Sequence, residues 1–431
     1  MFLEFLYKNI VDSFNTKVSY GSFECPLLIL QIVMWCIGGL LIYLAIKKDM
    51  EPTLLLPMGF GAILVNLPGS GAIGSEIINL WSGEASLFDD LKRFLETNPE
   101  VTAKQIIEFL QENLTLYEHE VAHGPLTTLF NAGIANELFP LLLFIGIGAM
   151  IDFAPILQNP KLMLFGAAAQ FGIFMTLSLA SFFFTPEEAA SIGIIGAADG
   201  PTAIVVGQKL LGENSNILGA IMVAAYSYMA LVPIIQPPII KLCTTQKERR
   251  IRMQYKGRKV TKLTKILFPI FVTIIAGLIA PESVALVGFL MFGNLIRECG
   301  VLENLSDTAQ HVLANLITIF LGITIATKME AAAFLSVNTI LVIGLGLFAF
   351  IFDTAGGVMF AKLYNVFAKE KINPMIGAAG ISAFPMSGRV VHKMGIKEDP
   401  QNFLLMHSMA VNVSGQIASV IAGGLILSFF A

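Results

Sequence analysis

Long apolar runs, separated by short charged or glycine-rich segments, fill most of the chain. The runs are long enough to cross the hydrocarbon core of a bilayer, allowing for tilt and for short broken helices. A basic segment, residues 241–265, divides them into two halves. The expected spans are residues 27–46, 53–68, 136–157, 162–184 and 217–240 in the first half, and 264–281, 283–298, 310–330, 335–361 and 403–430 in the second. This pattern predicts an all-α polytopic membrane protein.

Composition supports the membrane setting. Hydrophobic residues make up 55% of the 431 residues and charged residues only 13%, which excludes an ordinary soluble domain. No nucleic acid partner is expected. The first apolar run has no signal-peptide pattern before it and is interpreted as a retained helix. The four cysteines lie far apart without C-x-x-C spacing, so they indicate packing residues rather than a zinc site or a disulfide framework: Cys25, Cys36, Cys243 and Cys299.

The distribution of charge sets the orientation. Residues 241–265 hold ten Lys and Arg, and such loops stay on the cytoplasmic side. Residues 69–133 hold ten Asp and Glu against three Lys and Arg, which fits the outer side. The chain is therefore divided into an N-terminal region with two spans, an acidic outer segment, the remainder of the first half, the basic cytoplasmic loop and the second half: residues 1–68, 69–133, 134–240, 241–265 and 266–431.

Two near-copies interrupt the apolar sequence. Ile195-Gly-Ala-Ala-Asp-Gly-Pro-Thr-Ala203 is similar to Ile376-Gly-Ala-Ala-Gly-Ile-Ser-Ala383. Irregular backbone at membrane depth survives where it lines a cavity, and its repetition in both halves points to an ion or substrate site between inverted repeats. We expect re-entrant hairpins over 188–209, entering from outside, and 373–394, entering from the cytoplasm.

This scheme gives two inverted repeats of about five transmembrane helices each, because five is an odd number of crossings. It leaves Lys209 on the outer side, against the usual distribution of positive charge. The broken hairpins also suggest an elevator-like or rocking alternating-access motion.

Asp199 is the first candidate for a cation ligand. An ionised carboxylate at the centre of a span costs about 2.5–3.5 kcal/mol on insertion scales. Together with carbonyls freed by Gly200-Pro201 and the hydroxyl of Thr202, it offers an anionic, all-oxygen cage for Na⁺ or a proton relay. The alternative is a structural Asp that caps the broken helix. In the last span, Asn412 completes such a site or forms an interhelical hydrogen bond.

Arg389 is the candidate for anion capture. Its planar guanidinium, near Ser382 and Asn373 in the second copy, suits bidentate carboxylate binding; the alternative is a positive-inside anchor at the hairpin rim. Tyr226 and Tyr228 supply a phenol or a proton, or simply pack. Two further acids, Asp353 and Glu330, are placed at span ends in solvated or capping roles.

A metalloprotease motif occurs in the outer segment. His119-Glu-Val-Ala-His123 fits H-E-x-x-H, which on a helix binds zinc through two imidazoles. The following Gly124-Pro125 ends any helix, and the segment offers no further His. The surrounding segments 88–95 and 103–114 instead predict small amphipathic helices of an outer cap.

From about residue 50 onward the chain resembles the β subunits of the sodium-ion-translocating, biotin-dependent decarboxylases, which include oxaloacetate, methylmalonyl-CoA and glutaconyl-CoA decarboxylases. The similarity is carried by residues 193–208, 224–238, 244–253 and 373–389. The family's Ala-Asp-Gly-Pro-Thr aspartate matches Asp199, its hairpin asparagine, serine and arginine match Asn373, Ser382 and Arg389, and its last-helix asparagine matches Asn412. Where the family often has Gly-Pro before that asparagine, this chain has Ala410-Val411.

The resemblance implies a membrane subunit of the bacterial inner membrane. It would decarboxylate carboxybiotin delivered from the cytoplasm by a partner carrier, consume a proton and move Na⁺ outward. The implied Na⁺ ligands are Asp199, Thr202, Ser382 and Asn412. The implied catalytic residues are Arg389, Ser382, Asn373, Tyr226 and Tyr228, of which Arg389 and Asn373 would hold carboxybiotin.

The implied partners are a biotin-carrier and carboxyltransferase (α) subunit, a small γ or δ membrane subunit, membrane lipid and, as an open possibility, further copies of the β subunit. The competing hypothesis is a secondary transporter of the same architecture that carries a carboxylate with Na⁺ and catalyses no decarboxylation. It requires none of these partner subunits.

Overall fold

The computed structural model describes residues 2–20, 23–74, 94, 105, 124–212, 215–254 and 259–431. The first half of the chain contains α1 (Phe2–Asn15), β1 (Lys17–Tyr20), β2 (Phe23–Pro26), α2 (Leu27–Lys48), α3 (Pro52–Val65), α7 (Pro125–Gly133), α8 (Leu138–Met150), α9 (Ala154–Gln158), η2 (Pro160–Leu162), α10 (Met163–Ala169), α11 (Phe171–Ala180), α12 (Pro186–Gly193), η3 (Ile194–Ala197), α13 (Gly200–Leu211) and α14 (Asn216–Cys243).

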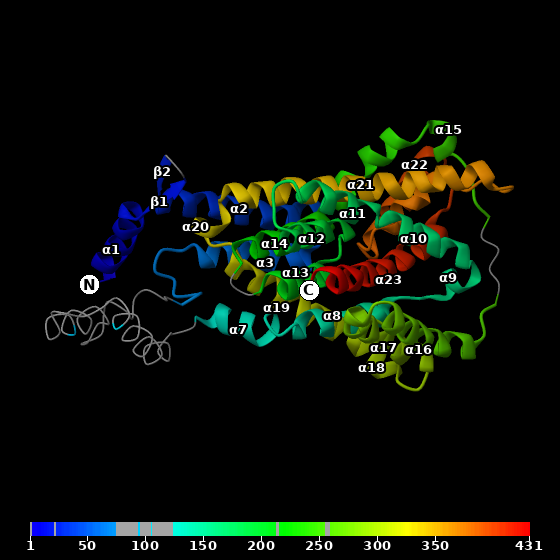
Figure 1. Cartoon of the computed structure of the whole chain (residues 1–431), viewed down its shortest axis with the longest axis horizontal. Coiled ribbons are helices and arrows are strands. Elements are labelled where there is room, and N and C mark those ends of the chain that lie inside the picture. The colour runs from blue at the N-terminus through cyan, green and yellow to red at the C-terminus, as the bar shows by residue number, and fades with distance from the viewer. Residues whose placement is uncertain are drawn as a thin grey trace.

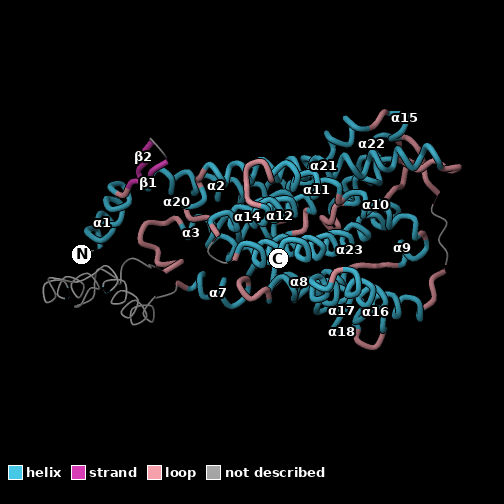
Figure 2. The backbone as a smooth tube through the Cα atoms, in the orientation of Figure 1, coloured by secondary structure: helices cyan, strands magenta, loops and turns pink. Residues whose placement is uncertain are grey.

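The second half begins after the short loop helix α15 (Gln246–Arg249). It contains α16 (Lys262–Ile279), η4 (Pro281–Ser283), α17 (Val284–Cys299), α18 (Glu303–Asp307), η5 (Thr308–Leu313), α19 (Ala314–Ile325), η6 (Ala326–Lys328), α20 (Ala331–Phe334), α21 (Val337–Phe367), η7 (Pro374–Gly380), α22 (Met386–Glu398) and α23 (Leu405–Phe430). Figure 2 shows that helices dominate the described chain.

The polytopic character predicted from the apolar runs is confirmed. Within the described residues, seven helices are long and apolar enough to cross a membrane, or eight if the pair α7 and α8, bent by 63°, forms one span. The shorter α3 is also apolar. The predicted last span is one continuous helix through Ala410-Val411, so the missing Gly-Pro leaves it unbroken.

The span expected over 162–184 corresponds to η2, α10 and α11, which together form one candidate span, Pro160–Ala180, with a turn at Gln170. Two other details of the prediction were wrong. The span expected over 136–157 ends at Met150, and α9 follows separately. The protein is also not all-α, because β1 and β2 pair antiparallel with Lys17 opposite Pro26. Val18, Tyr20 and Phe23 are of the residue types that favour strand.

The helices form two groups. In the core group, α10 packs on α23, α14 packs on α21, and α11 packs on both α12 and α21. In the flanking group, α3 packs on α2 and α19, while α17 packs on α8 and α16. Figure 1 shows α15 and α22 at the end of the molecule opposite α1 and the small sheet. Apolar side chains of the core group form one buried cluster that encloses the two near-copies.

Candidate functional site

The first near-copy forms a helical hairpin, residues 186–211, here called hairpin 1. A capping box between Thr185 and Glu188 starts α12, which continues through η3. Ala198 then takes a left-handed conformation with φ of 52°, which costs a non-glycine residue roughly 1–2 kcal/mol. Asp199 is extended, and Gly200-Pro201 begins α13. The chain therefore reverses at Ala198 and Asp199, and α12 packs against α13.

The charge of Lys209, at the end of hairpin 1, is paired. Its Nζ lies 3.2 Å from Oε2 of Glu282, which belongs to η4 between α16 and α17. Because α16 leads away from the basic loop, η4 lies at the far end of that helix. Lys209 thus lies on the outer side in the predicted topology, where Glu282 compensates its charge.

The second near-copy forms hairpin 2, residues 374–398. Oδ1 of Asn373 accepts a hydrogen bond from the backbone N–H of Met375, which starts η7. The chain is irregular from Ile381 to Pro385, and α22 then runs to Glu398. Gln236 of α14 is fully buried and connects the two arms of hairpin 2, η7 and α22. Its Nε2 donates to the Ala378 carbonyl at 2.6 Å and to Oγ of Ser387 at 2.8 Å.

The tips of the two hairpins touch. The backbone N–H and the Oγ of Ser382 both donate to the carbonyl oxygen of Ala197, at 3.1 and 2.7 Å. Nδ2 of Asn412 donates to the Ile381 carbonyl at 2.7 Å, while its Oδ1 is buried and has no partner among the described residues. Segments about 180 residues apart in the chain thus meet two residues from Asp199.

Asp199 is the centre of a buried polar cluster. Its side chain is only 3% exposed. Oδ2 accepts hydrogen bonds from Oγ1 of Thr202 at 2.7 Å, from Nε2 of Gln416 at 3.1 Å and from Oγ of Ser419 at 3.2 Å. The donors are uncharged, so they stabilise the carboxylate by roughly 1.5–3 kcal/mol each without neutralising it. A monovalent cation would supply the missing charge, and the hydroxyl and amide oxygens are suitable ligands for a hard cation.

The two tyrosines differ in their positions. The ring of Tyr226 lies against the hairpin tip, where a Cβ at Gly200 would come within 2.4 Å of it. The hydroxyl of Tyr226 is buried and has no partner in the described part of the chain. Tyr228 instead donates its hydroxyl hydrogen to the Ile343 carbonyl on α21, at 2.5 Å. Only Tyr226 lies beside the cluster with its hydroxyl free.

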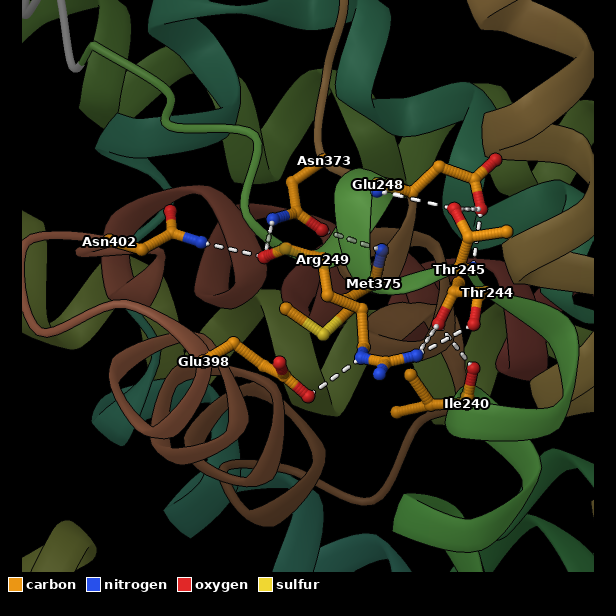
Figure 3. A network of polar contacts seen from close by, with 9 residues as sticks. All are labelled: Ile240, Thr244, Thr245, Glu248, Arg249, Asn373, Met375, Glu398 and Asn402. Atoms are coloured by element: carbon orange, nitrogen blue, oxygen red, sulfur yellow. Dashed lines mark hydrogen bonds and ion pairs between the residues drawn. The ribbon is translucent and has the colours of Figure 1, made fainter.

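Asn373 lies at the other end of hairpin 2, in a network with the basic loop (Figure 3). Its Nδ2 donates to the carbonyls of Arg249 and Ile251, at 2.8 and 2.9 Å. Nδ2 of Asn402 donates to the same Arg249 carbonyl at 2.9 Å, and Nε of Arg249 is 2.8 Å from Oε1 of Glu398. Both hydrogens of the Asn373 amide are used, so this side chain holds the loop over the start of η7.

Charged side chains of the basic loop also form hydrogen bonds and ion pairs that hold it in place. Arg252 binds Asp399 through two hydrogen bonds, at 2.6 and 3.1 Å, and these hold the pKa of Asp399 below its usual range. Partial burial raises the pKa of Glu248, but hydrogen bonds from Thr245 and Lys362 outweigh it, and the net pKa is lowered.

Arg389 is exposed near the start of α22. Among the residues that the structure describes, its side chain forms no ion pair or hydrogen bond. Burial raises the pKa of Glu51, at the start of α3, and the positive charge of Arg389 opposes that shift. The guanidinium is therefore available to an incoming carboxylate, with Glu51 as the nearby acid.

The structure thus brings together Asp199, Thr202, Ser382, Asn412 and Tyr226, and places Tyr228, Asn373 and Arg389 away from that cluster. It adds Gln416 and Ser419, which the sequence analysis missed. Asn412, Gln416 and Ser419 are spaced by four and three residues, so they share one face of α23. That polar stripe in an apolar helix was the available signal.

Asp353 was misplaced by the sequence analysis. It is fully buried in the middle of α21 rather than solvated at a span end. It does act as a cap, since it accepts a hydrogen bond from the first turn of α11. Glu330 is exposed, as expected. The H-E-x-x-H motif and most of the predicted amphipathic cap lie outside the described residues, and the described residues contain no cluster of His, Cys, Asp or Glu that would hold a metal ion.

Comparisons with known proteins give consistent matches. The family model described as "Na+-transporting oxaloacetate decarboxylase beta subunit" matches residues 30–430. The methylmalonyl-CoA decarboxylase subunit beta of Propionigenium modestum is 46% identical over 424 residues, which cover 98% of this chain and 99% of the relative. The oxaloacetate decarboxylase beta chain of Klebsiella pneumoniae is 46% identical over 415 residues, covering 93% and 95%.

Proposed function

Because this chain belongs to the family of the Na⁺-transporting oxaloacetate decarboxylase beta subunits, we propose that it decarboxylates carboxybiotin and couples this reaction to Na⁺ export. The predicted family resemblance is confirmed, and the chain is a multi-pass membrane subunit. The secondary-transporter alternative is not favoured, since the similar proteins are decarboxylase beta subunits.

The first part of the proposal is the Na⁺ site. Asp199 and Thr202 on hairpin 1, with Gln416 and Ser419 on α23, surround one buried carboxylate oxygen. Ser382 and Asn412 lie at the adjoining tip of hairpin 2. This anionic cluster of oxygen-bearing side chains, closed to water, is the single observation that carries the function. Na⁺ is the cargo that neutralises Asp199.

The second part is the carboxybiotin site. Decarboxylation breaks the bond between the biotin nitrogen and the carboxyl carbon; the electron pair stays on nitrogen, which takes up one proton, and CO₂ leaves. Arg389 binds the carboxylate through its guanidinium. Asn373 acts through position, by holding the basic loop and the first turn of hairpin 2. Tyr226, with its free hydroxyl, is favoured over Tyr228 as a proton donor.

The third part is an inverted repeat. The second expected span of the first half, α3, packs on α19 of the second half, and the second expected span of the second half, α17, packs correspondingly on α8. Likewise, the last span of the first half, α14, packs on α21 of the second half, and the last span of the second half, α23, packs on α10 of the first half. Hairpin 2 ends at the basic loop, through Arg249 and Glu398, while hairpin 1 ends at Glu282 on the opposite side. Contact between two hairpin tips from opposite sides supports alternating access, by an elevator-like or rocking motion.

The partners follow from the chemistry. A biotin carrier with its carboxyltransferase (α) subunit must deliver carboxybiotin from the cytoplasm, the side to which the predicted topology opens the exposed Arg389. A small γ or δ membrane subunit and further copies of the β subunit complete the proposed complex, in the bacterial inner membrane.

The test is decarboxylation of carboxybiotin by the reconstituted complex, with and without Na⁺, while ²²Na⁺ movement across the vesicle membrane is followed. We expect Na⁺-stimulated decarboxylation with coupled transport. Absence of decarboxylation, together with Na⁺-driven uptake of a free carboxylate, would overturn the proposal.

A further inference from the structure

Asp353 is a fully buried carboxylate to which the proposed reaction gives no role. It lies in the middle of the 31-residue helix α21. Oδ1 accepts a hydrogen bond from the backbone N–H of Gly172 at 2.6 Å. Oδ2 is buried and has no partner among the described residues. An ionised carboxylate in the membrane interior costs several kcal/mol unless a positive charge compensates it.

No basic side chain of the surrounding helices faces Asp353. Helix α21 packs on α10, α11, α12, α14, η3 and η7, of which α10, α11, η3 and η7 carry no ionisable side chain. The ionisable side chains of α12 and α14 are Glu187, Glu188, Tyr226, Tyr228, Lys241 and Cys243.

These groups are directed elsewhere. Tyr228 binds Ile343, ten residues or about 15 Å along α21 from Asp353. Lys241 is exposed, two residues before Cys243, and the Cys243 carbonyl accepts a hydrogen bond from Nζ of Lys362, nine residues from Asp353 in the other direction. The ring of Tyr226 lies against Gly200 in hairpin 1. Glu187 and Glu188 lie in the first turn of α12. The described protein therefore supplies no cation to Asp353.

The space around Oδ2 fits a proton better than a metal ion. The backbone of Gly196 approaches so closely that a Cβ there would lie 2.7 Å from Oδ2 and 2.9 Å from Cβ of Ala349. At Gly172 a Cβ would lie 2.5 Å from Oδ1. A coordinated metal ion needs several oxygen ligands around it, and on this side of Oδ2 the backbone of Gly196 leaves room only for the glycine hydrogen.

We propose that Asp353 is a proton-binding site, and that hairpin 1 couples its protonation to the cation at Asp199. The step is the addition of one H⁺ to the carboxylate, giving a neutral acid. Gly196 lies three residues before Asp199 in the same hairpin tip, so a shift of the tip on Na⁺ binding or release moves Gly196 relative to Oδ2. Withdrawal of Gly196 opens Oδ2 to proton exchange. The coupling rests on the proposed function, whereas the protonation does not.

Infrared difference spectroscopy tests the protonation on the purified full chain. Asp353→Asn keeps an acceptor for the Gly172 N–H, and its neutral amide replaces the neutral acid. We expect the wild-type minus Asp353→Asn spectrum at neutral pH to show a protonated carboxylic acid C=O band above the amide I band. The half-exposed carboxylate of Asp152 provides the control, since Asp152→Asn should remove no such band. A spectrum without the Asp353 band would overturn the proposal.

A second sample keeps the test valid if Asp353→Asn fails to fold. In Asp199→Asn protein labelled with ¹³C at aspartate carboxyls, Asp353 is the remaining fully buried aspartate of the described chain. An isotope-shifted acid band at neutral pH supports the proposal, and only ionised carboxylate bands contradict it.

Proton release on Na⁺ addition, followed with an indicator dye in weakly buffered detergent solution, tests the coupling. We expect Asp353→Asn to bind Na⁺ but to lose part of the wild-type proton release. Thr354→Val, at a buried hydroxyl on the same helix, should retain it. Unchanged release in Asp353→Asn would overturn the coupling. If the wild type binds no Na⁺, the proposed function fails, while the infrared result still decides whether Asp353 holds a proton.

Discussion

Hairpin 1 and hairpin 2 share the same glycine-alanine break but differ in how their polar groups are held. At hairpin 1 the neighbouring last helix, α23, directs Gln416 and Ser419 at a carboxylate. At hairpin 2 the neighbouring helix α14 directs Gln236 at a backbone carbonyl, and the charged residue in the first turn of α22 is the exposed Arg389. The same backbone device therefore presents a buried negative charge in one copy and an accessible positive charge in the other.

The difference separates two kinds of ligand. A buried carboxylate surrounded by neutral donors needs a cation and can exclude water from it. An exposed guanidinium suits a bulky, protein-delivered carboxylate. Ser382 of hairpin 2 donates a hydrogen bond to the Ala197 carbonyl of hairpin 1. A movement of one hairpin tip on ligand binding can therefore displace the other tip through this contact.

Asp199→Asn should have the largest effect, because it removes the charge that distinguishes hairpin 1. We expect Na⁺-dependent decarboxylation to fall to background while the complex still assembles. The measurement is the rate of carboxybiotin decarboxylation as a function of Na⁺ concentration. Asp152→Asn, at a half-exposed carboxylate, is the control and should behave as wild type. A normal rate and Na⁺ dependence in Asp199→Asn would remove Asp199 from the mechanism.

Arg389→Ala tests hairpin 2 in the same way. Loss of a charge-assisted carboxylate contact costs about 1.5–3 kcal/mol, which corresponds to roughly a 10- to 150-fold rise in the KM for carboxybiotin. Arg389→Lys should recover part of this, because a point charge replaces the bidentate fork. Lys393→Ala, one turn further along α22, serves as control. If KM stays at the wild-type value, Arg389 is only a topological anchor.

Gln236→Leu should loosen hairpin 2 without touching a ligand. The Ala378 carbonyl keeps its hydrogen bond from Ser387 but loses the shorter one from Gln236, a loss of about 1–3 kcal/mol. We expect a several-fold rise in the KM for carboxybiotin and a smaller change in the Na⁺ half-saturation. Gln31→Leu, at a buried glutamine of the flanking group, provides the comparison. Equal effects of both variants on KM would argue against a specific positioning role.

The smallest effect concerns the attachment of the basic loop to the end of hairpin 2. The pKa of Asp399 is held below its usual range by Arg252. The contact between Arg252 and Asp399 therefore contributes fully to the attachment of the loop above the ordinary aspartate pKa of about 3.9. This contribution is lost as the pH falls through the lower pKa that Asp399 has in the folded protein. We expect a dye on Lys247→Cys, in a background without the native cysteines, to show constant anisotropy from pH 8 to about pH 4.5 and lower anisotropy below about pH 4.

Asp399→Asn is the control for this titration. It should lower the anisotropy at every pH and reduce the drop at acidic pH. A loop that becomes mobile already near neutral pH would show that another group controls its attachment.

Much of the site was predictable from local sequence. The repeated glycine-alanine motif located both hairpins, and the requirement that a buried charge be compensated singled out Asp199. Ser382 was predicted from its place in the second near-copy, and Asn412 as a polar residue in the apolar last span. The structure puts both at the same junction. These residues carry their own local signal, a polar group in apolar surroundings.

The missed residues depend on packing between distant segments. Gln416 and Ser419 reach Asp199 across more than 200 residues of sequence, and Gln236 reaches Ala378 across 142. Asp353 was placed near a membrane surface because α21 is longer than a minimal span, so its middle was taken for its end. Asn373 was matched to ligand binding through the family, and the local sequence gave no sign that its amide also holds the backbone of the basic loop.

Equilibrium binding of Na⁺ to the purified chain, compared between wild type and Asp199→Asn by titration calorimetry, tests the Na⁺ site of hairpin 1 without carboxybiotin or a partner. We expect saturable Na⁺ binding in the wild type that is lost in Asp199→Asn and retained in Arg389→Ala. Wild-type binding in Asp199→Asn would contradict this expectation, since hairpin 1 would then not be the cation site.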